Sequence, residues 1–279
     1  MIPNPFTYVP ARGITAGIGR STIDGLSAVG QLGFLLADVI RTLFRDRPRR
    51  EVMAIQFYHI GFLSLPVVLI TGISMGLVLA VQSYVTLAKF SAEVMTGPMV
   101  NYSMVTQIGP VLSGLMVAGR VGSNMAAEIG TMQVTEQIDA LRVMGTNPVS
   151  YLVAPRFLAC VLLLPILSAL AAAAGVAVAS ILVVGVYQVD AGAYWFRSSQ
   201  FLLPWDILTG MGKTLVFGAI ISLVSCRQGL LTSGGATGVG TACTRGVVQA
   251  SLLILVANFI MTVMFNRAWY LLNPDWKNV

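Results

Sequence analysis

The residue best suited to chemistry in this sequence is Lys213, because it is the one charged side chain in an otherwise apolar segment at 207–226. An ionisable side chain inside a membrane-spanning segment is costly and indicates a functional role by default. The string GMGKT at 210–214 is similar to a phosphate-binding loop, but Ile207 stands where that loop requires its first glycine. We therefore expect no nucleotide site in this chain, and Lys213 is a buried cation that needs a partner.

Catalytic and metal-binding residues find little support elsewhere in the sequence. His59 is the only histidine, and no acidic residue lies within seven positions of it, so a Ser-His-Asp arrangement is not expected. The three cysteines, Cys160, Cys226 and Cys243, are widely spaced in or beside apolar segments and form no CxxC pair. Their setting is typical of small buried apolar residues, and we expect neither a metal site nor a disulfide framework.

The chain as a whole has 279 residues, of which 56% are apolar and 10% charged, and its mean hydropathy is +0.81. In soluble proteins about a quarter of the residues are charged. Stretches without charge that exceed the roughly 20 residues of a membrane-spanning helix occupy 52–88, 94–119, 157–189 and 246–266. With the segment of Lys213 as the fifth, the sequence predicts an all-α integral membrane protein, with one five-span domain at 52–271.

The distribution of basic residues predicts which side of the membrane each segment faces. Most of the 17 lie in residues 1–51, in the loop at 120–156 or in the loop at 227–245. The positive-inside rule places these segments in the cytoplasm, so we expect the N-terminus inside and the tail at 272–279 outside. The net charge of +6 has the same origin, and we expect no nucleic-acid partner because no recognition module accompanies the charges.

Residues 22–44 are too polar to span a membrane, yet apolar side chains recur there at helical spacing. The stripe consists of Ile23, Leu26, Leu32, Leu35, Val39 and Leu43. It predicts an amphipathic helix that lies in the membrane interface or packs against another helix. A basic cluster follows, for which attraction to anionic headgroups and a pure topology signal are both open; it consists of Arg45, Arg47, Arg49 and Arg50.

The segment at 120–145 alternates charged and apolar residues and is also too polar to span. Gly145 followed by Pro148 is a typical helix stop. A short charged helix at this place either caps the membrane bundle or receives force from a soluble motor. Composition alone leaves both interpretations open.

Four blocks of the sequence resemble one known family. They are QIGPVLSGLMVAGRVGSNMAAEIGTMQVTEQIDALRVMGTNPVSYLVAPRF at 107–157, GISMGLVLAVQ at 72–82, GKTLVFG at 212–218 and TRGVVQASLLILVANFIMT at 244–262. The chain is similar, over residues 30–270, to the MlaE/YrbE permeases of ABC transporters that work with MCE-domain proteins in lipid traffic. The resemblance implies an N-terminal interfacial helix plus five spans, a homodimer in the bacterial inner membrane, two cytoplasmic ABC ATPase subunits, and a ring of MCE-domain proteins on the extracytoplasmic side.

The resemblance also implies roles for individual residues. The segment 127–145, within the loop at 120–150, looks like the coupling helix that docks in the ATPase. Contact with the motor is expected from Glu128, Thr135, Glu136, Gln137 and Asp139. A lipid-binding cavity between protomers is expected to include Leu77, Val81, Tyr84, Gln107 and Lys213. The chain is then a non-enzymatic transport subunit for lipid, phospholipid above all, with no cofactor of its own and with ATP-Mg bound by the partner ATPase.

The sequence departs from the family at two positions. Gln107 and Asn258 stand where relatives carry acidic residues, whereas Lys213 is kept. We expect Lys213 to contact a lipid phosphate, to pair with the side-chain carbonyl of one of these amides, or to extend to the membrane interface.

Two alternatives come from other classes of protein. An intramembrane lipid-modifying enzyme needs nucleophiles, carboxylates or histidines clustered within the spans, where this chain offers Lys213 and His59. An ion-coupled secondary carrier typically has inverted repeats and paired intramembrane acids, which five spans of this composition do not supply.

Overall fold

The computed structural model of the chain describes residues 14–45 and 50–272, and within these ranges it contains helices and no strand. This agrees with the predicted all-α class. In chain order the α-helices are α1 (Ile14–Arg45), α2 (Arg50–Ile60), α3 (Leu65–Ala88), α4 (Thr96–Ser103), α5 (Gly109–Val117), α6 (Ser123–Val134), α7 (Gln137–Val143), α8 (Ala154–Gly185), α9 (Ala191–Phe201), α10 (Pro204–Leu230) and α11 (Gly235–Leu272). Outside the described part lie 1–13, 46–49 with Arg47 and Arg49 of the basic cluster, and the tail at 273–279.

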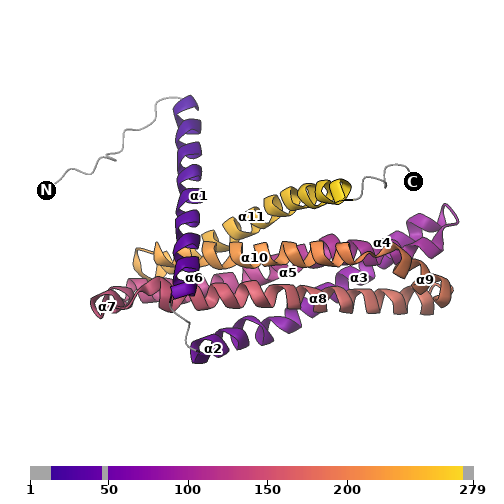
Figure 1. Cartoon of the computed structure of the whole chain (residues 1–279), viewed down its shortest axis with the longest axis horizontal. Coiled ribbons are helices and arrows are strands. Elements are labelled where there is room, and N and C mark those ends of the chain that lie inside the picture. Colours follow the sequence, from indigo (N-terminus) through magenta and orange to yellow (C-terminus); the bar gives the residue numbers. More distant parts are fainter. Residues whose placement is uncertain (1–13, 46–49, 273–279) are drawn as a thin grey trace.

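Five helical segments of the described chain are long and apolar enough to cross a membrane, which confirms the predicted number. They are Glu51–Ala88, Glu93–Val134, Val149–Gly185, Pro204–Leu230 and Gly235–Leu272. The first four run along a common direction, and α11 leans away from them toward its C-terminal end (Figure 1). The chain is therefore a multi-pass membrane protein. An odd number of spans puts the two ends of this part on opposite sides of the membrane, and which end faces the cytoplasm stays a prediction.

The centre of the bundle consists of α8 and α10, which pack against α3, α5, α6 and α11. Glycines permit the closest approach between α3 and α8. A Cβ atom on Gly72 would lie 2.5 Å from the Ala171 carbonyl oxygen, and one on Gly76 would meet the carbonyl oxygen of Gly175. The GxxxG pair of α3 thus packs two helices of one chain together, as small residues commonly do between membrane helices.

The helix of the second span continues past Arg120 to Val134, so the first part of the segment at 120–145 is helical and continuous with this span. Two π-helical turns interrupt it, Met104–Ile108 and Ala118–Gly122. Arg120 lies in the second turn, and its Nη1 donates a hydrogen bond to Ser64 Oγ at 3.0 Å. The helix continues through this charged residue, and Ser64 gives its guanidinium group a polar partner. Single π turns in helices occur often at functional sites.

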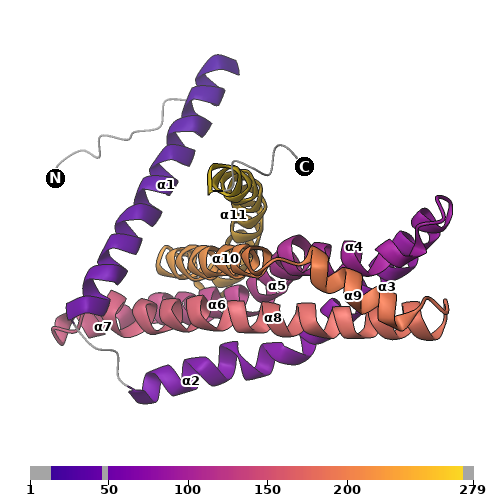
Figure 2. The ribbon, with the colours of Figure 1, turned by 45° about the vertical axis from the view of Figure 1, so that its right-hand side comes forward.

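Helix α1 crosses the bundle at a steep angle, at the end that carries α6 and α7 (Figures 1 and 2). Its C-terminal half packs there: Val39 is fully buried in a cluster with residues of α6, α7 and α8, and Leu32 and Leu35 lie against it. The predicted apolar stripe therefore packs against other helices over this half. The side chains of Ile23 and Leu26, in the other half, lie outside the described part.

The opposite end of the bundle is closed by the short helix α9 (Figure 1). The Asp190 side chain caps this helix by accepting a hydrogen bond from the Ala193 N–H at 2.6 Å. Tyr194 is fully buried against α4, where Gly97 leaves room for its ring. Burial raises the pKa of Tyr194 to about 12, so this phenol stays neutral at physiological pH.

Candidate functional site

Lys213 lies in the interior of the bundle, on α10, with 2% of its surface exposed. Its Nζ donates hydrogen bonds to Gln107 Oε1 at 2.9 Å and to the Thr106 backbone oxygen at 3.0 Å. Of the three contacts expected for Lys213, the structure therefore contains the pairing with an amide carbonyl, and the amide is Gln107. Two short bonds to oxygen compensate part of the cost of keeping an ammonium group away from water.

The π-helical turn Met104–Ile108 supplies both oxygen atoms. In this turn the backbone hydrogen bonds are shifted by one residue, as in the bond from Gly109 N to Met104 O. Gly210, on α10, lets the two helices approach, because a Cβ atom there would meet the carbonyl oxygen of Val105. The first glycine of the GMGKT string thus serves the contact between α10 and the second span.

Helix α11 adds a second layer of polar groups. Gln107 Nε2 donates to Thr262 Oγ1 at 3.4 Å, and Thr262 Oγ1 donates to the Asn258 backbone oxygen at 2.7 Å. No carboxylate of the described residues forms an ion pair with Lys213, so neutral groups alone hold this charge. The cavity beside the cluster measures about 20 Å³, which is room for a water molecule and far too small for a lipid chain.

The other three predicted lipid-binding residues lie elsewhere, on α3. Leu77 is half-buried, Val81 is 40% exposed, and the ring of Tyr84 stacks on that of Tyr187 with centroids 3.9 Å apart. The main neighbour of α3 is α8, whereas Lys213 faces the second span and α11. The structure brings Gln107 and Lys213 together within one chain and places Leu77, Val81 and Tyr84 apart from them.

A larger apolar cavity of about 400 Å³ lies between the second span, α8, α9 and α10. Sequence reasoning missed it, although the run of small residues at 171–175 was a possible signal, since small side chains leave space between helices. Two of its polar atoms, Asn101 Oδ1 and Ser198 Oγ, are buried and have no hydrogen-bond partner among the described residues. Its wall includes Asn101, Ser168, Ala172, Ala173, Trp195 and Met211.

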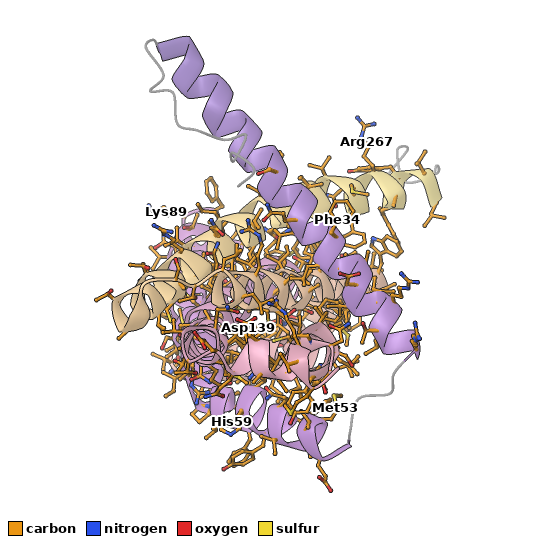
Figure 3. All side chains as sticks on the ribbon, turned by 90° about the vertical axis from the view of Figure 1, so that its left-hand side faces the viewer. Phe34, Met53, His59, Lys89, Asp139 and Arg267 are labelled. Carbon is orange, nitrogen blue, oxygen red and sulfur yellow. The ribbon has the colours of Figure 1, made fainter. Side chains whose placement is uncertain are left out.

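The predicted coupling segment is two helices rather than one. It breaks at Glu136, whose backbone has a left-handed conformation with φ of 59°, and the exposed helix α7 follows. Gly145, with φ of 74°, ends α7 as its sequence position predicts. Asp139 lies on α7 at the front of Figure 3, which views the bundle from this end. It forms an ion pair with Arg142 at 2.8 Å.

All five predicted motor-contact residues are exposed, and four of them lie in or directly before α7: Thr135, Glu136, Gln137 and Asp139. Two apolar neighbours that sequence reasoning missed are also exposed, Val143 at 88% and Met144 at 69%. Charged and apolar side chains thus form one accessible surface around α7. We call these six residues the α7 surface.

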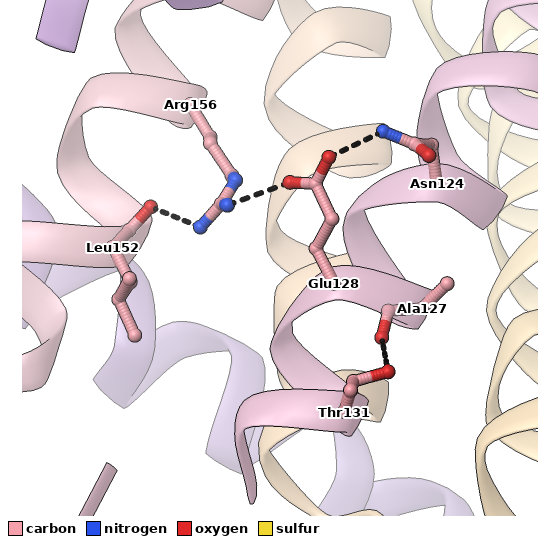
Figure 4. Close-up of polar contacts among 6 residues, drawn as sticks. All are labelled: Asn124, Ala127, Glu128, Thr131, Leu152 and Arg156. Carbon is pink, nitrogen blue, oxygen red and sulfur yellow. Dashed lines mark hydrogen bonds and ion pairs between the residues drawn. The ribbon is translucent and has the colours of Figure 1, made fainter. Parts of the chain in front are cut away.

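Glu128, the fifth predicted motor contact, is also exposed, with 45% of its side-chain surface accessible, but it lies on α6 and is already paired (Figure 4). Its carboxylate accepts hydrogen bonds from Arg156 Nη2 at 2.8 Å and from Asn124 Nδ2 at 2.7 Å. Arg156 is nearly buried and also donates to the Leu152 backbone oxygen at 3.0 Å. This ion pair ties α6 to α8, so Glu128 fixes the base from which α7 projects.

Comparison with known proteins agrees with this architecture. The family described as Permease MlaE matches residues 53–264. A probable ABC transporter permease protein of Rickettsia conorii is 41% identical over 90% of this chain and 97% of the relative. The intermembrane phospholipid transport system permease protein MlaE of Haemophilus influenzae is 35% identical over the same shares of both chains. The chloroplastic protein TRIGALACTOSYLDIACYLGLYCEROL 1 of Arabidopsis thaliana is 38% identical over 75% of this chain and 60% of its own length. With a match over most of its length, this chain belongs to the MlaE permease family.

Proposed function

We propose that this chain is the transmembrane permease subunit of an ABC transporter that moves phospholipid between the bacterial inner membrane and an MCE-domain partner. The observation that carries the proposal is the α7 surface, an exposed charged and apolar surface at one end of a five-span bundle whose sequence has no nucleotide-binding loop. Membership of the MlaE permease family and the phospholipid transport named for the Haemophilus relative support the substrate class.

The motor is a separate ABC ATPase, and two copies would bind a homodimer of this chain. Extracting a lipid from a bilayer exposes many methylene groups to water at about 0.8 kcal/mol each, so the step needs an external source of free energy. Thr135, Glu136, Gln137 and Asp139 would contact the ATPase, with Val143 and Met144 as apolar anchors. Glu128 would act indirectly, because its bond to Arg156 holds α6 against α8.

The lipid path would run along the spans, with the end at α7 in the cytoplasm and the end at α9 facing the MCE-domain ring. Leu77, Val81 and Tyr84 would contribute the face of α3 to a cavity shared by two protomers. Lys213 would act within the protein, where it holds the second span to α10 through Gln107. A change of helix packing that broke this bond would expose a positive charge to an anionic lipid headgroup.

The test is co-purification of the tagged full-length chain from a membrane that contains its partners, with quantitative mass spectrometry. We expect an ABC ATPase in roughly equal amount together with an MCE-domain protein. The variants Glu136→Arg and Asp139→Arg should lower the amount of co-purified ATPase at least tenfold, because each replaces a carboxylate of the docking surface by a larger group of opposite charge. Arg197→Glu, an exposed charge on α9 at the other end, is the matched control and should keep it.

Retention of the ATPase by both α7 variants would contradict the assignment of the docking surface. Recovery of the chain without any ATPase, from a membrane that contains one, would contradict the transporter proposal itself.

A further inference from the structure

A polar cavity of about 390 Å³ lies between α2 and the middle of the second span, near the end of the bundle that carries α7. It is separate from the Lys213 cluster and from the apolar cavity beside α9. Unlike the apolar cavity, it is lined by charged and amide side chains as well as aliphatic ones. Its polar lining consists of Gln56, His59, Arg120, Asn124 and Glu128.

Arg120 is the charged group of this cavity that lacks a counter-ion. A guanidinium group has five N–H donors. The structure gives Arg120 one hydrogen bond, from Nη1 to Ser64 Oγ at 3.0 Å, and no described carboxylate pairs with it. Ser64 is itself buried, so this bond holds the guanidinium at the wall of the cavity and leaves its other donors available. A guanidinium group with free donors in a cavity favours an anionic ligand.

The one carboxylate in the lining, on Glu128, does not supply that anion. One of its oxygens accepts a hydrogen bond from Arg156 and the other from Asn124 (Figure 4). Glu128 and Arg156 therefore balance each other, and the cavity keeps the positive charge of Arg120. His59, on α2, adds a second nitrogen group that can donate a hydrogen bond.

The surface beside the cavity is of the kind that contacts lipid. The first span exposes Ile55 at 57%, Tyr58 at 54% and Phe62 at 66%, and the two aromatic rings stack with centroids 5.5 Å apart. Aromatic side chains of this type gather at the level of lipid headgroups. Ile55 also lines the cavity, so the polar lining is continuous with this apolar surface. A ligand with one anionic group and hydrocarbon chains matches both the polar cavity and the apolar surface beside it.

We propose that Arg120 binds the phosphodiester of a phospholipid headgroup, with His59 and Gln56 as further hydrogen-bond donors and the acyl chains along the exposed face of the first span. The planar guanidinium matches two phosphate oxygens at once, which a lysine does not. Basic pockets between transmembrane helices are a recurrent way to hold lipid headgroups. The inference deepens the proposed function by naming a headgroup site for its substrate class.

The experiment measures lipid binding to the purified full-length chain in detergent, without any ATPase. The probe is short-chain phosphatidylglycerol, whose only charge is the phosphate, compared with diacylglycerol of the same chain length and with inorganic phosphate. We expect phosphatidylglycerol to bind more tightly than diacylglycerol, and Arg120→Gln to weaken it about tenfold or more. Arg120→Lys should recover only part of the affinity. Arg142→Gln, which removes an exposed arginine of α7, is the matched control and should leave binding unchanged.

Equal binding of phosphatidylglycerol and diacylglycerol to the wild-type chain would overturn the proposal, and this comparison decides the matter even if Arg120→Gln does not fold. Inorganic phosphate that binds through Arg120 and excludes the lipid would overturn it too, in favour of a free-anion site. A dimer in which the second copy of the chain fills the cavity, so that no lipid binds in it, would also overturn the proposal. Loss of ATPase co-purification with headgroup binding intact would contradict the proposed function and leave this site standing.

Discussion

The bond between Lys213 and Gln107 can be tested by a double-mutant cycle. The first variant is Gln107→Leu, which keeps the approximate size of the side chain and removes the oxygen 2.9 Å from Lys213 Nζ. The second is Lys213→Met, which removes the charge and keeps most of the apolar stem. The third carries both substitutions.

The expected magnitudes follow from the two hydrogen bonds of Lys213. A hydrogen bond to a charged group contributes about 1.5–3 kcal/mol to the free energy of unfolding. Lys213 is only 2% exposed and the adjoining cavity of about 20 Å³ holds one water molecule at most, so bulk solvent does not replace the lost oxygen and Gln107→Leu should lower the free energy of unfolding by about 2–3 kcal/mol. Lys213→Met should cost about 1–2 kcal/mol, because it removes the charge together with its need for a partner. The double variant should resemble Lys213→Met alone, so the coupling energy should equal the cost of Gln107→Leu, about 2–3 kcal/mol.

The assay is reversible unfolding by sodium dodecyl sulfate in mixed micelles, followed by tryptophan fluorescence and circular dichroism. Gln82→Leu is the control, because Gln82 is exposed on α3, and it should change the free energy of unfolding by less than about 0.5 kcal/mol. Additive losses in the double variant would refute the reasoning, because they would mean that Lys213 and Gln107 act independently. Gln107→Glu should be tolerated, since the carboxylate would face the ammonium group directly.

Three further perturbations test the packing and the α7 end, two by the same unfolding assay and one by amide hydrogen exchange. Gly72→Val should lower the free energy of unfolding by about 1–3 kcal/mol, because the added side chain forces α3 away from α8. Gly185→Val should lower it less, because nothing lies within 4 Å of its added Cβ. Equal losses would argue against the close contact between α3 and α8. Glu128→Gln should lower the free energy of unfolding by about 1–3 kcal/mol, a range that allows for a carboxylate that is 45% exposed. The double variant with Arg156→Gln should lose less than the two single variants lose together. Additive losses would contradict the ion pair. Gly145→Ala puts a side chain at φ of 74° and should speed amide hydrogen exchange in α7, through strain of about 1–2 kcal/mol; unchanged exchange would contradict its role as a helix stop.

The five spans could be predicted because crossing a membrane depends on local properties, the length of a segment and its lack of charge. The contact that Arg120 makes could not, because Ser64, which accepts its hydrogen bond, lies 56 residues away. A contact between segments so distant along the chain leaves no periodic signal in either of them.

The coupling segment illustrates a different limit. Its residues alternate with helical period throughout 127–145, so one helix is the economical prediction. The first half belongs instead to the bundle, where Ile129 is fully buried and packs on Gly229 of α10, and the chain must turn before α7 can lie outside. The turn falls on Glu136, which enters a left-handed conformation that its residue type does not favour. Packing against α10, and not the local sequence, fixes the position of the break.

The partners of Lys213 and Arg120 in the structure reverse the order of importance that the sequence suggests for these two cations. Lys213 attracts attention in the sequence because its neighbours are apolar, whereas Arg120 resembles an ordinary charge at a membrane boundary. In the structure Lys213 has two oxygen partners and is closed off, and Arg120 has one neutral partner and lines a cavity of about 390 Å³. A ligand can reach only a charge that the protein has not already satisfied. The geometry therefore favours Arg120 over Lys213 as the first group to meet a lipid phosphate, and it leaves Lys213 the task of holding the second span to α10.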